Sequence, residues 1–394
     1  MRIGMILDNV YPPDPRVENE AIELIKSGHT VFLFCLTYGN EEKEENIQGI
    51  EVRRYKTNEL EYKLSALAYT IPLYSILMKS KIKDFITKNK IEAIHIHDIR
   101  IAEAAFLANK KANLPTTLDL HENRPEIMRF YPHLQKPLGK LLISISKWKK
   151  KEEEFVKKSS KVVVVTEDAK QELVDRVGVN KDKIIVVPNT IRTSFFEGNE
   201  ALPISFNKQP EDFIVLYLGD TGTRRGLKTV VDGIINIEKE EKIKNIKFVI
   251  VGKESRYLEK MIHEYNLQKQ VVLMGWQNDK TFRSWIEISD VCVSPLHRNI
   301  HHDTTYANKI FQYMSMGKPV LVSDATAQKK VVEQHGSGLV HVAEDVKDFT
   351  DKLLTLYHDK TLRDSLGTKG ASFIKNHFTW DKTSEQLINL YKNL

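Results

Sequence analysis

Short apolar runs alternate with helix-like segments through the first half of the chain, and this alternation predicts an α/β fold. In the segment 17–27, Ala21, Leu24 and Ile25 recur at helical spacing, and Gly28 follows them. Because the apolar runs are continuous, we expect parallel strands that are covered by helices on both faces. The strands predicted in this half are 3–7, 31–36, 94–97, 116–120, 162–165 and 184–187.

The same pattern restarts after about residue 211 and predicts a second α/β domain. The segment from about 192 to 211 carries no clear periodicity and contains Pro203 and Pro210, so we interpret it as the interdomain linker. Ligands of α/β domains bind at the carboxyl ends of the strands, so two such domains predict an active site in a cleft between them. The predicted elements are strands 214–218, 248–251, 271–274, 291–293 and 320–322, two helices within 345–375, and a last helix from about 381 to 394.

The stretch 301–319 predicts a loop that leads into an amphipathic helix. Ile310, Tyr313 and Met314 share one helical face, and Gly317 ends the helix. A helix N-terminus presents free N–H groups and a partial positive charge, which suit a phosphate. An ordinary surface helix is the alternative. The polar residues expected around the helix start are Asp303, Thr304, Thr305, Asn308 and Lys309.

A glycine-rich turn follows the first predicted strand of the second domain. The segment 219–227 has the sequence Gly-Asp-Thr-Gly-Thr-Arg-Arg-Gly-Leu. Glycines such as Gly222 let the backbone approach a ligand closely, and the helix expected from Gly226 directs its N-terminus to the same place. Arg224 and Arg225 add fork-shaped donors that match phosphate oxygens. A Gly-Thr turn alone is common, but with these arginines the loop predicts a diphosphate site.

Histidines and acids lie at the ends of predicted strands in the first domain. His121 directly follows one strand, with Glu122 beside it, and a histidine there can donate to a sugar hydroxyl or act near a leaving group. A hydrogen-bonded structural histidine is the alternative. His95 and His97 share one face of the preceding strand, because side chains alternate with period 2. His97 and Asp98 at the strand end form the better site candidate, and His95 is interpreted as structural.

Arg16 follows a proline-rich loop, at the expected start of the first helix. The helix dipole favours an acid rather than a base at this position. An anionic ligand for Arg16 is therefore one interpretation, and a solvated surface arginine is the other.

The composition limits the classes of function. The chain has 394 residues, of which 41% are hydrophobic, and this length suits two domains. The net charge of +6, with a pI of about 8.9, is mild over this length. It argues against a nucleic-acid partner and is compatible with anionic substrates or an anionic membrane surface. The two cysteines, Cys35 and Cys292, lie in apolar runs and indicate buried thiols in a reducing compartment, with no metal site or disulfide framework.

We expect neither a signal peptide nor a membrane-spanning segment. The first residues, MRIGMILD, predict a short strand and a turn. No apolar run reaches the ~18 residues that are needed to span a bilayer. The protein is therefore expected to be cytoplasmic and at most peripheral to a membrane.

Two segments combine apolar residues at helical spacing with many lysines. A basic amphipathic helix of this kind can lie on an anionic membrane. A core-facing helix with a solvated lysine face is the alternative. The first segment contains Leu138, Leu141, Leu142, Ile145 and Trp148, and the second is 64–78, which precedes Lys79, Lys81 and Lys83.

Several motifs follow one another along nearly the whole chain. They are DPRVENEAIELIKSGHTV, LDLHENRPE, VVVVTEDAKQEL, IIVVPNTI, LYLGDTGTRRGL, VLMGW, ISDVCVSPL and NKIFQYMSMGKPVLVSD. In this order they resemble the family 4 glycosyltransferases, which have the GT-B fold. The resemblance implies two Rossmann-like domains facing across a cleft, an acceptor domain (1–195) and a donor domain (196–377). It also implies a C-terminal helix (378–394) that crosses back to pack on the N-terminal domain.

The resemblance also implies a reaction. A sugar would pass from a UDP- or GDP-linked nucleotide sugar to a hydroxyl of a glycan or lipid-linked acceptor, with retention of the anomeric configuration. Neither a metal nor another cofactor is implied, because arginine, lysine and helix ends stabilise the leaving diphosphate. The implied product is a bacterial-type surface glycan that is made at the cytoplasmic membrane face.

The matched motifs imply roles for individual residues. The expected catalytic residues are His121, Asp98 and Thr304. Arg16 and Glu122 are expected on the acceptor side. The donor-binding set is Arg224, Arg225 and Lys309 for the diphosphate, Gln312 for the ribose, the backbone near Gly252 and Trp276 for the base, and Gly222, Asp303, Thr305 and Asn308 around them.

The chain departs from the family pattern in its donor half. The family typically carries two glutamates separated by seven residues, and the aligned positions hold Thr304 and Gln312. In the donor loop the lysine position holds Arg225 and the arginine position holds Asp220. Thr304 cannot supply a carboxylate, although Asp303 is its neighbour. In the first loop, Asp14-Pro15-Arg16 stands in place of the usual glycine pair.

These departures leave two further hypotheses open. One is a non-catalytic GT-B subunit that binds a nucleotide sugar or a partner transferase. The other is a different GT-B enzyme, such as a sugar-nucleotide 2-epimerase.

Overall fold

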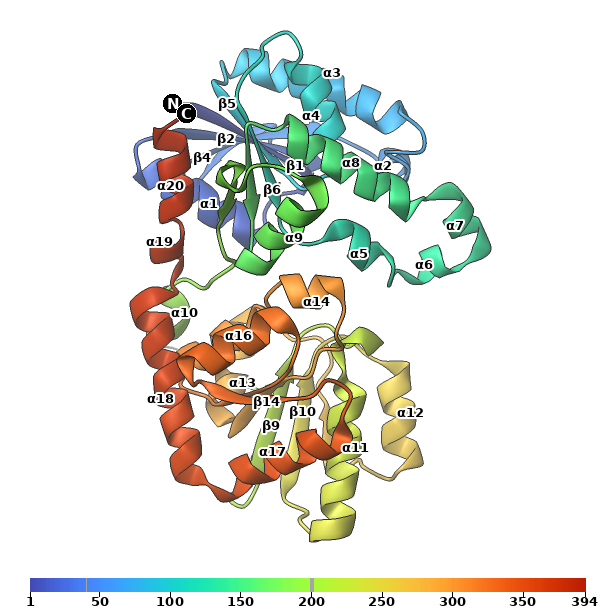
Figure 1. Ribbon diagram of the computed structural model, residues 1–394, viewed down its shortest axis with the longest axis vertical. Helices are drawn as coiled ribbons and strands as arrows, with labels where there is room; N and C mark the ends of the chain where they lie inside the picture. The colour runs from blue at the N-terminus through green and yellow to red at the C-terminus, as the bar shows by residue number, and fades with distance from the viewer. Residues whose placement is uncertain (40, 199–201) are drawn as a thin grey trace. The chain divides into compact units, whose positions relative to one another are not determined.

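The computed structural model describes residues 1–39, 41–198 and 202–394, and the chain divides into two compact units (Figure 1). Unit 1 consists of Met1–Asn189 and Thr383–Leu394, and unit 2 is Thr190–Lys382. The division predicted between 195 and 196 therefore falls a short way inside unit 2. Residues 199–201 of the predicted linker lie outside the described residues.

Unit 1 is built on a sheet with the strand order β3-β4-β2-β1-β5-β6-β7-β8. Its strands pair in parallel, as the continuous apolar runs predict, except that β3 and β4 form an antiparallel hairpin at the sheet edge. This hairpin was not predicted. The strands are β1 (Arg2–Val10), β2 (Thr30–Thr37), β3 (Glu44–Ile47), β4 (Ile50–Lys56), β5 (Ala93–His97), β6 (Thr116–Leu120), β7 (Lys161–Val164) and β8 (Ile184–Val186).

Helices of unit 1 bury the sheet on both faces. Strand residues such as Ile96 and Leu118 share one apolar cluster with residues of α3, α4 and α8, whereas α1 and α20 contact each other (Figure 1). Asp14 begins α1 by accepting a hydrogen bond from Val17 N at 3.2 Å. The helices are α1 (Pro15–Lys26), α2 (Glu59–Ser65), α3 (Leu73–Lys88), α4 (Ala102–Asn109), α5 (Arg124–Met128), α6 (Pro132–Gln135), α7 (Pro137–Leu142), α8 (Ile145–Lys158), α9 (Glu167–Val177), the turn η1 (Lys181–Lys183) and α20 (Glu385–Lys392).

Neither of the two predicted lysine-rich helices is continuous. The segment 64–78 is interrupted between α2 and α3, where Pro72 precedes α3; proline lacks an N–H and restricts the residue before it. The segment around Leu141 breaks at Ser144, which caps α8 by accepting a hydrogen bond from Lys147 N. Trp148 is buried in the core, whereas the side chain of Leu141 is 80% exposed. The side chain of Leu138 lies outside the described part.

Unit 2 contains a second sheet, in which all adjacent strands pair in parallel in the order β11-β10-β9-β12-β13-β14. Strand β14 was not predicted. Val215 and Tyr217 pack against α11 and α17 on one face, and Leu216 and Leu218 pack against α13 and α15 on the other. The strands are β9 (Phe213–Leu218), β10 (Ile246–Val251), β11 (Val271–Leu273), β12 (Val291–Ser294), β13 (Val320–Ser323) and β14 (Gly338–His341).

The helices of unit 2 follow the strands in chain order. The two helices predicted within 345–375 are confirmed as α17 and α18. The helices are α10 (Ser194–Glu197), η2 (Thr223–Arg225), α11 (Leu227–Asn236), η3 (Ile237–Glu241), α12 (Arg256–Glu264), η4 (Asp279–Thr281), α13 (Phe282–Ile288), α14 (Ile300–Thr304), α15 (Lys309–Ser315), α16 (Thr326–His335), α17 (Val346–His358) and α18 (Lys360–His377), with α19 (Trp380–Thr383) at the junction of the units.

The C-terminal segment returns to unit 1. Helix α20 contacts α1 and β8, and Gln386 accepts a hydrogen bond from Val186 N at 3.2 Å. Tyr391 is buried, and its hydroxyl lies 2.8 Å from His95 Nδ1. The prediction placed all of 378–394 on the N-terminal domain, but residues 378–382 group with unit 2.

Two further expectations concern cysteines and membrane spans. Cys35 and Cys292 are buried free thiols, and burial raises the pKa of each to about 12. Among the described residues, no helix combines the length and the apolar character that crossing a bilayer requires.

Candidate functional site

The first candidate site lies at the carboxyl end of β9 in unit 2. The loop after this strand contains two glycines in the left-handed region, Gly219 (φ +116°) and Gly226 (φ +74°). A β-carbon on Gly226 would lie 1.7 Å from Pro295 O, so only glycine permits the approach of these two loops. Helix α11 begins directly afterwards, as predicted. The geometry thus places the η2 turn with its two arginines at the edge of the sheet where α/β domains bind ligands.

Three cations gather around one carboxylate at this edge. Arg225 Nε donates to Asp220 Oδ2 at 3.1 Å, and Arg224 Nη2 lies 3.7 Å from the same oxygen. Lys309 Nζ lies 3.5 Å from the centroid of the Tyr217 ring and would lie 3.2 Å from a β-carbon on Gly219. Arg224, Arg225 and Lys309, which we call the cationic cluster, therefore share one place, although they come from loops far apart in sequence.

Burial and neighbouring positive charge act together on the titratable groups near the cluster. Burial, followed by the charge of Arg225, holds the pKa of Lys309 well below its usual range. Burial and neighbouring positive charge also lower the pKa of His301 to about 3 and that of His302 to about 4. An anionic ligand would relieve this repulsion, so the cluster has the electrostatics of an anion site.

A cavity of about 310 Å³ opens beside the cluster. Its lining includes Gly219, Asp220, Gly252 and Trp276. A β-carbon on Gly252 would lie 2.0 Å from Gly219 O, so these two loops touch through a glycine. The side chain of Trp276 is 72% exposed, which leaves its ring free to stack on a flat ligand. The residues predicted to frame a nucleobase therefore line a cavity next to the predicted diphosphate site.

The stretch 301–319 differs from its prediction. Asp303 and Thr304 belong to the separate short helix α14, which Asn299 caps, and α15 begins only at Lys309. The Thr304 hydroxyl donates to Ile300 O at 2.7 Å within α14. The expectation that both polar residues gather at the start of the amphipathic helix is therefore wrong. Gly317 does follow the end of α15, with φ +69°.

Asp303 is used by the fold. Its carboxylate accepts a hydrogen bond from Thr326 N at 2.8 Å, at the start of α16, and pairs with Arg298 at 3.3 Å. Its carboxylate therefore has a structural role between α14 and α16, and its donor-binding role stays a prediction. Thr305 and Gln312 are half-buried and Asn308 is exposed, and Gly222 N donates to Asp220 Oδ1 at 3.2 Å.

The second candidate site lies in unit 1, where β5 and β6 end. His121 Nε2 lies 2.9 Å from Asp119 Oδ2 and 3.1 Å from His97 Nδ1. Its Nδ1 faces Asp98 Oδ2 at 4.0 Å. Burial opposes a charge on His121, but the carboxylates of Asp119 and Asp98 outweigh it and raise the pKa to about 9. Burial instead lowers the pKa of His97, so of these two touching imidazoles His121 carries the proton.

Arg16 belongs to the same buried network, and its predicted acceptor role is wrong. Its side chain is 4% exposed, and it donates to both carboxylate oxygens of Asp119, at 2.9 Å and 2.7 Å. It also pairs with Glu20 at 2.9 Å. The anion that balances the charge of Arg16 at the start of α1 is therefore the carboxylate of Asp119, not an external ligand. Sequence reasoning missed Asp119. Its position was a usable signal, because Asp119 lies one residue before the end of β6 and two residues before His121.

Four buried side chains could hold a metal by residue type. One ligand atom from each of Glu20, His95, His97 and Asp119 lies within 4.8 Å of the others. The Arg16 guanidinium already forms ion pairs with both carboxylates of this group, those of Glu20 and Asp119. A further cation would meet that charge at close range, so these residues do not fit a metal. They fit a charge network that supports His121.

The remaining predicted residue of unit 1 is Glu122. Its Oε1 lies 3.6 Å from Arg124 Nη1, and Arg124 Nη1 lies 3.8 Å from Asp98 Oδ2. The backbone at Asp98 has φ +64°, a conformation that is rare for a residue with a side chain. Such strain is found at functional positions more often than elsewhere.

Comparison with known proteins gives two family-model matches that together span most of the chain. Residues 16–195 match the model described as Glycosyltransferase Family 4, and residues 199–373 match the model described as Glycosyl transferases group 1.

Curated relatives and solved structures agree with these matches. The capsular polysaccharide biosynthesis glycosyltransferase CapM of Staphylococcus aureus is 23% identical over 238 residues, 58% of this chain and 60% of the relative. The UDP-Gal:alpha-D-GlcNAc-diphosphoundecaprenol alpha-1,3-galactosyltransferase of Escherichia coli is 24% identical over 231 residues, 56% of this chain and 57% of the relative. The part of these and similar curated relatives that the chain matches spans about half to three fifths of each relative's length.

The fold is that of a solved glycosyltransferase. The sucrose-phosphate synthase of Thermosynechococcus elongatus superposes with a TM-score of 0.77 and 18% identity, covering 100% of this chain and 98% of that one. At this identity the likeness concerns the fold alone.

Proposed function

We propose, from the premise that this chain belongs to the family 4, group 1 glycosyltransferases of GT-B fold, that it transfers a sugar from a nucleoside-diphosphate sugar to an acceptor hydroxyl with retention of configuration. Unit 2 binds the donor and unit 1 binds the acceptor. The acceptor is a glycan or a lipid-linked glycan of surface polysaccharide synthesis, as the names of the two relatives indicate for those proteins. The reaction takes place at the cytoplasmic face of the membrane.

The observation that carries the proposal is the cationic cluster beside the 310 Å³ cavity. A diphosphate between Arg224, Arg225 and Lys309 would meet charge-assisted donors, and its negative charge would oppose the burial and the arginine charge that lower the pKa of Lys309. The same groups stabilise negative charge as it develops on the leaving diphosphate, which is the task that a metal performs in other enzymes. We therefore propose that no metal takes part. The ring of Trp276 and the backbone at Gly252 contact the base.

His121 is assigned to the transferred sugar. Because its Nε2 faces Asp119 and its Nδ1 has only a distant carboxylate, the Nδ1 proton remains available to a sugar oxygen. A protonated imidazole at neutral pH can donate that hydrogen bond and offset charge near the leaving group. Asp119 acts as a positioning residue for His121, and Asp98 lies on its ligand side.

The test measures nucleoside diphosphate binding and then turnover. Thermal shift and calorimetry with UDP and GDP should show binding of at least one of them, and Arg225→Gln should weaken it by about tenfold or more, since a charged hydrogen bond is lost. Lys228→Gln is the matched control, because Lys228 lies in the first turn of α11 and pairs with Asp232, away from the cavity lining. Absence of binding by both diphosphates, or equal affinities in the two variants, would refute the site.

Turnover decides between this proposal and a non-catalytic subunit. That alternative is favoured by the hydroxyl of Thr304 turning to Ile300 O and by the carboxylate of Asp303 serving α16, because neither offers a carboxylate to the reacting carbon. UDP or GDP release should be measured with a panel of nucleotide sugars and lipid-linked and soluble glycan acceptors. Tight diphosphate binding without release from any donor would support the non-catalytic subunit.

A further inference from the structure

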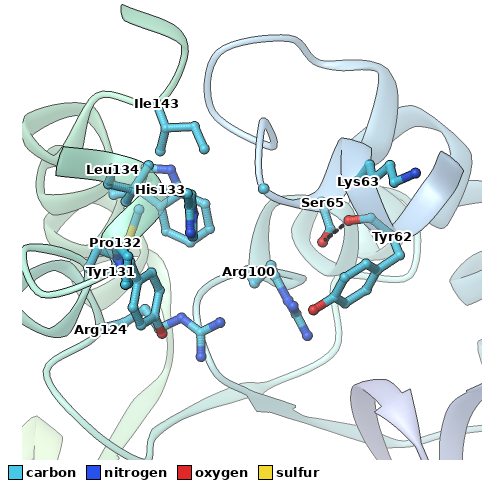
Figure 2. A pocket seen from close by; sticks show the side chains of 13 residues that line it. Tyr62, Lys63, Ser65, Arg100, Arg124, Tyr131, Pro132, His133, Leu134 and Ile143 are labelled. Carbon is cyan, nitrogen blue, oxygen red and sulfur yellow. Dashed lines mark hydrogen bonds between the residues drawn. The ribbon is translucent and has the colours of Figure 1, made fainter. Parts of the chain in front are cut away.

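Unit 1 contains a second hollow, of about 450 Å³, that the proposed roles above do not use (Figure 2). We call it the arginine–tyrosine pocket. It is formed by segments far apart in sequence, α2, the loop before α4, α5, and the chain from α6 to α8. Its lining includes Tyr62, Arg100, Arg124, Tyr131, Leu134 and Ile143.

Hydrogen-bond donors point into this pocket. Figure 2 shows the guanidinium groups of Arg100 and Arg124 between the two walls, with Tyr62 directed toward Arg100 and Tyr131 beside Arg124. Arg100 is held by Asp8, whose Oδ1 accepts from its Nη2 at 2.8 Å. This ion pair fixes the charge at the pocket floor without filling the pocket.

Arg124 is held less closely than Arg100, by two longer ion pairs. Its side chain is 21% exposed, and its Nη1 has only Glu122 at 3.6 Å and Asp98 at 3.8 Å as anionic neighbours. It donates no side-chain hydrogen bond to another described residue. A guanidinium presents five donors in a fixed fork, and leaving them unmet in a half-buried position is unfavourable. A phosphate oxygen set, which only accepts, would satisfy this fork and the adjacent tyrosine hydroxyls.

Part of the pocket lining is apolar, and Figure 2 shows Leu134 and Ile143 on the side that also carries Tyr131 and Arg124. Leu134 is buried and Ile143 is partly buried, and both line the pocket together with Met128 and Trp148. The neighbouring helix α7 carries two exposed leucines, Leu141 and Leu142. Leu142 directly precedes Ile143 of the pocket lining, so an apolar chain attached to the phosphate could extend from the pocket towards α7.

The pocket also adjoins the proposed reaction residue. Asp98 Oδ2 lies within 4.0 Å of both Arg124 Nη1 and His121 Nδ1. A group bound at Arg124 thus holds its neighbouring atoms close to His121.

We infer that the arginine–tyrosine pocket binds the acceptor, and that this acceptor is a phosphate ester. The inference rests on the proposed transferase function and names the substrate class of its acceptor site. Either a membrane-anchored lipid phosphate or a soluble phosphate ester supplies this chemistry.

The experiment measures binding without nucleotide and without turnover, so it can fail independently of the proposed function. The full chain is labelled with 5-fluorotryptophan, because Trp148 lines the pocket and its ¹⁹F signal is assigned with Trp148→Phe. It is titrated with geranyl phosphate, glucose 6-phosphate and uncharged geraniol. We expect a phosphate ester to shift the Trp148 signal at concentrations at which geraniol leaves it unchanged.

Two arginine variants locate the phosphate. Arg124→Gln should weaken binding of the phosphate ester by about tenfold or more, since a charge-assisted fork is lost. Arg129→Gln should bind as the unmodified protein does, because Arg129 pairs with Glu126 on the same segment and does not line the pocket. UDP or GDP binding in unit 2 serves as the folding control for both variants, together with the melting temperature.

The outcomes separate cleanly. Tighter binding of geranyl phosphate identifies a lipid-linked acceptor, and equal or tighter binding of glucose 6-phosphate identifies a soluble ester; both support the pocket. Geraniol binding as tightly as geranyl phosphate, no binding by either ester, or equal affinities of Arg124→Gln and Arg129→Gln would overturn it.

Discussion

The proton on His121 should stabilise unit 1 in a defined pH range, and replacing His121 by asparagine should remove that effect. The side chain is 17% exposed and its pKa is raised to about 9 from 6.5. At about 1.4 kcal/mol per pH unit, this difference corresponds to about 3 kcal/mol. Because the folded-state pKa is the higher one, the stabilisation is fully present below pH 6.5 and is lost as the pH rises through 9.

The assay compares urea unfolding of the two proteins at pH 6.5 and pH 9. Trp148 is the only tryptophan of unit 1, so its ¹⁹F signal reports the unfolding of this unit separately. The loss of unfolding free energy between these pH values should be about 2.5 kcal/mol larger in the unmodified protein than in His121→Asn. Other groups that titrate in this range are common to both proteins and cancel in the comparison.

A direct titration supplies the second readout. The imidazole signal that disappears in His121→Asn should titrate near pH 9 in NMR spectra of ¹³C-histidine-labelled protein. A midpoint at or below 6.5, or the same pH dependence of stability in both proteins, would show that Asp119 and Asp98 do not hold the proton. The proposed donation from His121 to the sugar at neutral pH would then lose its basis.

Three further predictions concern other parts of the network and the donor loop. Gly226→Ala should destabilise unit 2 by about 3 kcal/mol or more because a methyl group would collide with the backbone of Pro295, whereas Gly178→Ala, with a similar φ but open space, should cost about 1 kcal/mol; equal costs in thermal unfolding would contradict the collision. Arg16→Gln should destabilise unit 1 by about 3–5 kcal/mol, because a buried carboxylate pair loses its cation; a stable variant with impaired ester binding would instead restore the ligand role. Binding of UDP or GDP at pH 8 should take up protons, because the lowered pKa of Lys309 rises beside an anion; calorimetry in buffers of different ionisation enthalpy measures this, and proton release would contradict it.

The sequence predicts the strands well because buried parallel strands are continuous apolar runs. Ile214–Leu218 falls within β9, and Gly226 precedes α11 as predicted. The elements it misses have weaker local signals. The hairpin of β3 and β4 carries exposed acids and lies at the sheet edge, where only one side needs apolar residues.

Tertiary partners account for the errors at the site. The carboxylate that Arg16 binds, Asp119, is 103 residues away in sequence, so local reasoning assigns its charge to an external ligand. The arginine–tyrosine pocket combines segments from residue 62 to residue 148, and no local pattern links them. The helix breaks at Pro72 and Ser144 could have been predicted from a proline and a capping serine. They were missed because the prediction relied on apolar periodicity alone.

The return of the last helix to unit 1 has a consequence for biosynthesis. The ribosome makes Thr190–Lys382 before it makes Tyr391, so the histidine network of unit 1 lacks the tyrosine hydroxyl until all of unit 2 has been synthesised. A chain truncated after Lys382 would expose the surface that α20 covers and leave His95 without that hydroxyl. Unit 1 can therefore be completed only after unit 2 has been synthesised.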